Sequence, residues 1–370
     1  MRAHLLTNGI IHSASDPYAT AALVADGVVA WLGSDDSAAL VAGPEVPRQD
    51  LDGAVVAPAF VAPWGTAADA RDALLRGTAV VTVLEGWDAR SQGQADAAPP
   101  APAARPAARP AARTVVYRAP ETVDAAAAGV WLPTDDGLDA SSLAGLVAAS
   151  TQAGEQAYLV PAHRDHTGDP DAVARAQSAA VAALRSVAGE LGAPALGRVR
   201  HRLAVTGPLD AADRGFLAGI GVSVTVAPDA EGVLRAPVAS LLADAVPLAL
   251  AAGPDGDPWA AVRAALTHPE EDERISARSA FTAATRTGLR VLPDVPAARV
   301  EATPRLVVSA AATFAVWDAD AVTVQSPDGR VAAWSTDTRA GTPLLPALDA
   351  ETALPRWRAT WLDGAVAAQA

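Results

Sequence analysis

The chain has 370 residues, enough for one large domain or two ordinary ones. Its 42 acidic residues outnumber its 28 basic residues, which gives a formal net charge of −14, and the sequence contains neither Lys nor Cys. These absences exclude a catalytic thiol, a disulfide, a Schiff-base or phosphate-loop lysine, and a carboxylated lysine that bridges two metals. The acidic charge argues against nucleic acid and against an anionic membrane surface as partners.

Hydropathy along the chain gives no sign of membrane insertion or export. No apolar stretch approaches the roughly 20 residues that span a bilayer. Polar residues interrupt the N-terminal segment MRAHLLTNGIIHSASDPYA, which therefore lacks the apolar core of a secretory signal. We expect a soluble, cytoplasmic protein.

The N-terminal part is predicted to form short strands joined by tight turns. In residues 4–33, apolar runs flank Asn8-Gly9 and Asp26-Gly27, dipeptides that favour such turns. The elements expected next are an apolar strand region at 51–64, a short helix at 66–77 and a buried strand at 79–86. The Pro/Ala-rich segment 94–113 has little apolar surface to bury and is predicted to be a linker.

From residue 114 onward, strands alternate with helices, a pattern typical of parallel βα units. Strands are predicted at 114–118, 156–163, 198–205, 222–228 and 246–252, and helices at 141–153, 170–191, 210–218, 236–244, 257–267 and 276–287. The final part returns to short strands with Asp-Gly turns. The sequence therefore predicts β structure at both ends of the chain and alternating strands and helices between them.

This order of elements resembles the amidohydrolase superfamily, and within it the amidohydrolase-3 branch. The segments that carry the resemblance are LLTNGIIHSAS, RVRHRLAVTGPLDAADRGFLAGIGVSVTVAPD, VPLALAAGPDGDPWAAVRAALTHPEE and ATWLDGAV. The resemblance implies an α/β fold: a truncated or distorted TIM-like (β/α) barrel at 55–299, with a small composite β-sandwich built from 1–54 and 300–370. Few strands are predicted between the first barrel strand and the helix at 141–153, so we expect much of that half of the barrel to be missing.

The metal-binding signature of the family is altered in this chain. The family ends its first barrel strand with Pro-Gly-Phe-Val-Asp-x-His-x-His, and the matching stretch here begins at Pro58. Ala62 replaces the Asp, and Trp64 and Thr66 replace the two His. Alkyl and indole groups do not ligate zinc, and a threonine hydroxyl is a poor ligand for it. We expect Trp64 to pack in the core, a role that is compatible with its filling the space that the metal would occupy.

Other family positions have candidate matches. His201 matches the histidine of the strand-six motif Arg-Ile-Glu-His, and His163, or alternatively His166, matches the histidine of strand five. The family's catalytic Asp follows strand eight, where Asp255 and Asp257 lie two and four residues beyond the matching position. The resemblance implies that these side chains would meet at the mouth of the barrel.

The resemblance implies metal-dependent hydrolysis of amide or other C–N bonds, whereas the missing ligands predict that hydrolysis is lost. We therefore expect a non-catalytic binding or partner protein without a cofactor. The alternative is a residual mononuclear amidohydrolase that acts on non-peptide C–N bonds, with zinc or another divalent metal held by His163 or His166, His201 and one Asp. The sequence is compatible with a small-molecule ligand and with assembly into a homo-oligomer.

Overall fold

The computed structural model describes residues 3–87, 110–134, 139–161, 170–253, 256–299, 305–325, 334–335 and 342–370. Most of the predicted linker 94–113 lies outside the described residues, as do His163, His166 and Asp255. Among the helices that are described, none combines the length and the apolar character that a membrane span requires.

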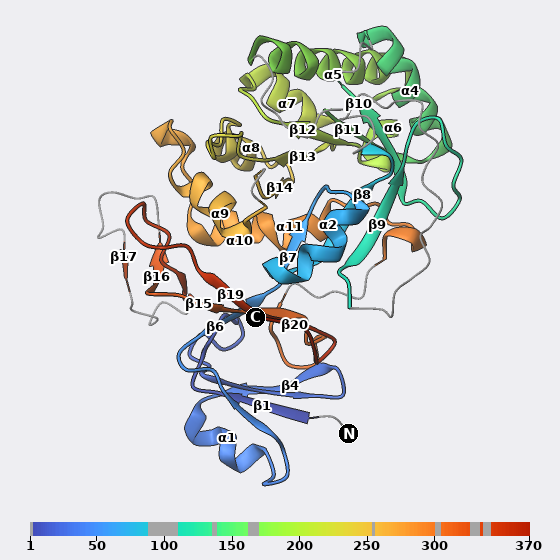
Figure 1. Ribbon diagram of the computed structural model, residues 1–370. Coiled ribbons are helices and arrows are strands. Elements are labelled where there is room, and N and C mark those ends of the chain that lie inside the picture. The colour runs from blue at the N-terminus through green and yellow to red at the C-terminus, as the bar shows by residue number, and fades with distance from the viewer. Residues whose placement is uncertain are drawn as a thin grey trace.

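Eight parallel strands form the central sheet and follow one another in chain order around a nearly closed barrel (Figure 1). They are β7 (Phe60–Ala62), β8 (Thr78–Leu84), β9 (Arg113–Arg118), β10 (Gly129–Pro133), β11 (Gln156–Val160), β12 (Arg202–Val205), β13 (Ser223–Val226) and β14 (Leu248–Leu250). Within the described residues no strand ladder joins β14 to β7, so the barrel has a seam there. The predicted TIM-like fold is confirmed.

The prediction that much of the first half of the barrel is missing is wrong, because strand β10 completes the set of eight. The Gly and Pro at the ends of GVWLP suggest a break in a strand, yet Gly129 is required for packing. A Cβ atom at Gly129 would lie 2.4 Å from the carbonyl oxygen of Gln156 and 2.8 Å from the Tyr117 ring. The barrel is trimmed in a different way: residues 119–128, between β9 and β10, contain no helix.

Helices cover the outside of the barrel, with α4 and α5 packed together at one side (Figure 1). The helical segments are α2 (Ala67–Asp72), η1 (Ala73–Arg76), α4 (Ala140–Ala153), α5 (Pro170–Leu191), α6 (Ala193–Val199), α7 (Ala211–Gly219), α8 (Val238–Ala243), α9 (Pro258–Leu266), η2 (Glu271–Glu273), α10 (Ala277–Ala284), α11 (Arg286–Arg290) and η3 (Pro296–Ala298). Most of these match the predicted helices. Helix α6 differs, because it occupies residues that the sequence pattern assigned in part to a strand, and η2, η3 and most of α11 were not predicted.

Alternate residues of the barrel strands face the helices and the interior. On β12, Leu203 and Val205 belong to the main apolar core under the helices, which leaves Arg202 and Ala204 on the inward face. On β11, Tyr158 and Val160 belong to a second cluster inside the barrel. Side chains therefore fill the interior, as in other small barrels.

Two further sheets lie below the barrel in Figure 1 and combine both ends of the chain. The first has the order β4-β3-β1-β5 and the second β2-β6-β15-β19-β20. Their strands are β1 (Ala3–Thr7), β2 (Ile10–Ile11), β3 (Ala21–Ala25), β4 (Val28–Gly33), β5 (Arg48–Asp50), β6 (Val55–Pro58), β15 (Phe314–Asp318), β19 (Arg356–Leu362) and β20 (Ala365–Gln369). Helix α1 (Asp35–Val41) covers the first sheet, and β16 (Val322–Gln325), β17 (Trp334–Ser335) and β18 (Leu345–Pro346) form a small third sheet.

A shared core joins the two larger sheets. It includes Leu6 and Val56 from the N-terminal part and Phe314 and Trp361 from the C-terminal part. Strand β6 pairs with β15 in antiparallel register, from Val55 opposite Trp317 to Pro58 opposite Phe314. The N-terminal contribution to this β structure therefore extends to Pro58.

Candidate functional site

A cavity of about 170 Å³ lies at the carboxyl ends of the barrel strands, the face on which TIM-barrel enzymes keep their chemistry. It lies between the segments that follow β7 and β14, and thus beside the seam of the barrel. Asp69, Asp72 and Arg76 supply its charged lining, and Trp64 supplies an aromatic wall.

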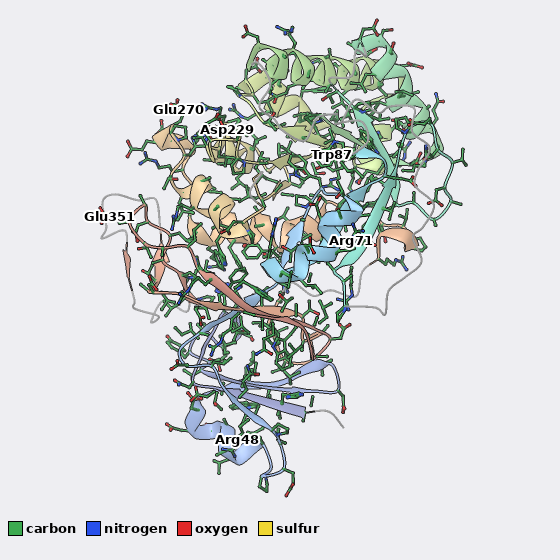
Figure 2. All side chains as sticks on the ribbon, viewed as in Figure 1. Arg48, Arg71, Trp87, Asp229, Glu270 and Glu351 are labelled. Carbon is green, nitrogen blue, oxygen red and sulfur yellow. The ribbon has the colours of Figure 1, made fainter. Side chains whose placement is uncertain are left out.

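Trp64 stands where the resemblance places a metal-binding histidine. Its ring contacts that of Trp87, with 6.3 Å between the ring centroids. Trp87 follows the end of β8 in the barrel part of the molecule (Figure 2), where its indole N–H donates a hydrogen bond of 2.9 Å to the carbonyl of Pro161. Two indole rings therefore occupy this part of the mouth.

Thr66, at the second histidine position of the family motif, caps helix α2. Its hydroxyl accepts a hydrogen bond from the backbone N–H of Asp69 and donates one to the Asp69 carboxylate. The same carboxylate accepts the backbone N–H of Thr66 at 2.7 Å, which completes a capping box. The local sequence thus uses both side chains to begin a helix.

These residues do not fit the metal that the resemblance implies. Zinc requires nitrogen, sulfur or carboxylate oxygen donors. Ala62 and Trp64 offer none, and the hydroxyl of Thr66 is held in the helix cap. Within the described ranges, no group of three or more His, Cys, Asp or Glu side chains is placed to hold a metal ion.

His201 lies at the opposite end of the barrel from this cavity. The strand predicted at 198–205 begins only at Arg202, because the preceding residues form helix α6, which ends at Arg200 in the left-handed conformation with φ of 56°. His201 therefore precedes β12 instead of ending it. The prediction that His201 lies at the mouth is wrong.

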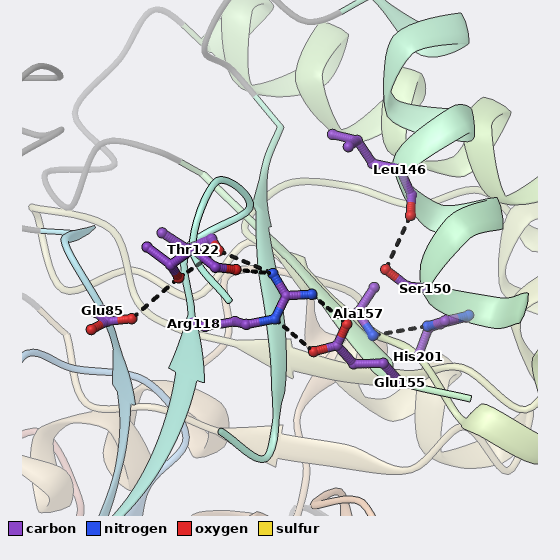
Figure 3. A network of polar contacts seen from close by, with 9 residues as sticks. Glu85, Arg118, Thr122, Leu146, Ser150, Glu155, Ala157 and His201 are labelled. Atoms are coloured by element: carbon purple, nitrogen blue, oxygen red, sulfur yellow. Dashed lines mark hydrogen bonds and ion pairs between the residues drawn. The ribbon is translucent and has the colours of Figure 1, made fainter. Parts of the chain in front are cut away.

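Both ring nitrogens of His201 make hydrogen bonds inside the protein. The backbone N–H of Ala157 donates to Nδ1 at 3.0 Å (Figure 3), and Nε2 lies 2.9 Å from the Thr151 hydroxyl. That hydroxyl donates its own proton to the carbonyl of Val147, so it accepts from Nε2–H. The imidazole is therefore neutral, with its lone pair engaged, and it joins α4, β11 and β12.

Burial lowers the pKa of His201 from 6.5 to about 4. Between these values the unfolded chain binds a proton that the folded chain does not. Stability is therefore fully present above pH 6.5 and falls as the pH drops toward 4, by about 3 kcal/mol for this group. Burial also lowers the pKa of His12, which adds to the loss in the same direction.

We therefore expect His201→Gln to flatten the decline in unfolding free energy between pH 7 and pH 4.5, measured by urea titration at each pH. The variant should also cost about 1–3 kcal/mol at pH 7, because it disturbs buried hydrogen bonds. Thr151→Ser keeps the hydroxyl and should keep the wild-type slope. An unchanged slope in His201→Gln would contradict the neutral, buried assignment.

Asp257 is the N-cap of α9. Its carboxylate accepts the backbone N–H of Trp259 at 2.8 Å and that of Ala260 at 3.3 Å. It follows β14, at the end of the barrel away from His201, so the structure does not bring these two predicted site residues together. His163, His166 and Asp255 lie outside the described residues.

Arg202 is the site residue that the sequence analysis missed. Its side chain is fully buried and crosses the barrel interior to the segment after β7, where Nη2 donates to the carbonyl of Pro63 at 3.0 Å. The same nitrogen donates to the Thr225 hydroxyl at 3.3 Å. The alternating pattern RLAV, with an arginine among apolar residues of a buried strand, is the signal that could have revealed it.

The guanidinium of Arg202 packs against two tyrosine rings. Its central carbon lies 3.9 Å from the ring centroid of Tyr158 and 5.7 Å from that of Tyr117, distances that allow cation–π attraction. Burial raises the pKa of Tyr117 and raises the pKa of Tyr158 to about 12, so both phenols are neutral at pH 7. The interior therefore carries the positive charge of Arg202 next to Pro63, within the stretch that matches the family's metal motif.

No protein-family model and no curated protein matches the sequence. The fold is nevertheless similar to that of several solved structures. A variant of the atrazine chlorohydrolase of Arthrobacter aurescens, complexed with zinc and atraton, aligns with a TM-score of 0.59 and 13% identity over 98% of this chain and 94% of that chain. An adenosine deaminase from Xanthomonas campestris with bound zinc has a TM-score of 0.54 and 14% identity over 98% and 92% of the two chains.

The N-isopropylammelide isopropylaminohydrolase of Burkholderia multivorans has a TM-score of 0.55 and 14% identity over the whole of both chains. These structures are TIM-barrel amidohydrolases. At such low identity the similarity establishes the fold of this chain: an eight-stranded barrel with flanking β-sheets.

Proposed function

We propose that this chain is an amidohydrolase-superfamily protein that binds a small-molecule ligand without hydrolysing it. Fold similarity over nearly the full length and the family-like order of segments support the ancestry. The exchange of ligands for Trp64 and Thr66 supports the loss of hydrolysis. The observation that carries the proposal is the buried Arg202, because a fixed positive charge in the barrel interior disfavours a divalent cation nearby.

The alternative is a residual hydrolase with a mononuclear site, and the zinc in two of the similar structures favours it. Such a site would need His163 or His166 together with Asp255 or Asp257. His201 would not contribute, because its lone pair already accepts the Ala157 N–H. Asp257 would have to leave the cap of α9.

The test is metal analysis of the full chain after purification with added zinc and dialysis against a weak chelator, combined with a hydrolysis screen on N-acyl compounds and deaminase substrates. We expect substoichiometric metal and no hydrolysis above the uncatalysed rate. One metal per chain together with hydrolysis would contradict the proposal. In that case His166→Ala and His163→Ala would identify the ligand, with Trp64→Phe as a matched control at the mouth.

A further inference from the structure

The barrel interior contains a positive charge for which the described residues supply no counter-charge. Arg202 has no exposed surface, and no described residue forms a hydrogen bond with its Nε or Nη1 atom. Among the described residues, no carboxylate forms an ion pair with it. Buried arginines are normally paired, because an isolated buried charge costs several kcal/mol.

Further polar atoms that lack a hydrogen-bond partner within the described part of the chain lie on the same inward face. They are the hydroxyl oxygens of Tyr158, Ser223 and Thr82, all buried. Tyr158 and Ser223 are the residues that pair with Arg202 in strand register, one on each side of it. Since buried polar groups are rarely left unsatisfied, this concentration of donors indicates a missing binding partner.

The chemistry of the surroundings defines that partner. The two nearest ionisable groups, Tyr117 and Tyr158, are neutral phenols, so the local charge is that of a single guanidinium. A water molecule could accept hydrogen bonds here but would not compensate the charge. Aromatic and alkyl side chains such as Trp131 and Ala204 belong to the apolar cluster of the interior, so a partner of Arg202 has to be small.

We propose that the barrel interior binds one small monovalent oxyanion, such as formate, acetate or nitrate, against Arg202, with the hydroxyls of Tyr158 and Ser223 as additional donors. Guanidinium groups favour planar oxyanions because their N–H groups match the oxygen geometry. The inference rests on the proposed function in one respect: it takes the interior to be free of metal. It names the ligand class that the proposed binding function would use.

The direct measurement is isothermal titration calorimetry on the full, metal-free chain in a low-salt buffer with a bulky organic counter-ion, titrated separately with sodium formate, acetate, nitrate and chloride. We expect one saturable site per chain for at least one of the oxyanions, with weaker binding of chloride. Absence of saturable binding for all three oxyanions would overturn the inference.

Thermal unfolding at constant ionic strength gives a second readout. Binding should raise the melting temperature by about 3–4 °C when the anion is present at about 100 times its dissociation constant. Arg202→Gln should abolish the rise, whereas Arg185→Gln, on the partly exposed face of α5, should retain it. An equal rise in both variants would overturn the inference, and the calorimetry on the unmodified chain decides the matter if Arg202→Gln does not fold.

The two proposals fail separately. Stoichiometric metal with hydrolysis would contradict the loss of catalysis, whatever the anion titrations show. A metal-free, inactive protein that binds none of the oxyanions would contradict the anion site and leave the loss of hydrolysis supported.

Discussion

A chain that ends at residue 299 is expected to lose cooperative folding. The truncation removes β15, β19 and β20, which form most of the five-stranded sheet, and leaves the two-residue β2 and four-residue β6 behind. It also removes Phe314 and Trp361, whose stacked rings, 5.2 Å apart, lie in the core shared with the N-terminal sheet. A sheet of this size is not stable alone.

Urea titration monitored by circular dichroism and tryptophan fluorescence tests this expectation. The 1–299 fragment should be insoluble or should unfold without a sigmoidal transition, as expected when specific packing is lost. Co-expression with a 300–370 fragment should restore a cooperative transition. A 1–299 fragment that unfolds at the midpoint of the full chain would show that the C-terminal strands are dispensable.

Local signals in the sequence account for much of the fold. The Asp26-Gly27 turn, with positive φ at both residues, joins β3 and β4 as predicted. Thr66 caps the start of α2 and Gly154 caps the end of α4, close to the bounds predicted for these helices. These elements are set by turn and cap preferences of residues close in sequence, which do not depend on distant parts of the chain.

Local sequence patterns do not predict the structure at positions where tertiary contacts decide it. Strand β10 contains Gly129 because its neighbours leave no room for a side chain, and a single sequence does not reveal that crowding. The residues before His201 alternate like a strand but form α6, which packs on α4 and α5. Because the predicted strand starts too early in the chain, His201 was predicted at the wrong end of the barrel.

The candidate site was only partly predictable. The replacement of metal ligands by Trp64 and Thr66 could be read directly, because it depends on side-chain chemistry alone. The importance of Arg202 could not be read from the sequence. It depends on which side chains surround the guanidinium and on the lack of a carboxylate beside it among the described residues. The inward alternation of QAYLV and RLAV places Tyr158 and Arg202 together only once the strand order is known.

A cluster of aromatic rings connects the barrel to the β-sheets. Trp259 of α9 has no exposed surface and contacts Phe60 of β7, Phe281 of α10 and Trp317 of β15, with ring centroids 5.1, 5.4 and 5.7 Å away. Three of these residues belong to the barrel part, and Trp317 belongs to the five-stranded sheet. Trp259 therefore packs against both the barrel and the five-stranded sheet.

Trp259→Ala is expected to lower the unfolding free energy by about 3–5 kcal/mol, because it removes a large buried ring and leaves a cavity that the helices and sheet cannot close. Trp259→Phe keeps a ring in contact with its neighbours and also removes an indole N–H that forms no hydrogen bond with any described residue. It should therefore cost much less, about 1.5 kcal/mol or below. Urea titrations of both variants at pH 7 measure the difference.

Leu75→Ala is the matched control, because this side chain of η1 is 51% exposed and its truncation should change the unfolding free energy by less than about 0.5 kcal/mol. Strand β6 leads directly into barrel strand β7 and still pairs with β15, so Trp259→Ala should keep a single transition, with the whole curve shifted to lower urea. Two separate transitions in that variant would mean that the barrel and the sheets unfold independently once the contact is lost. A shift no larger than that of Leu75→Ala would contradict the role assigned to Trp259.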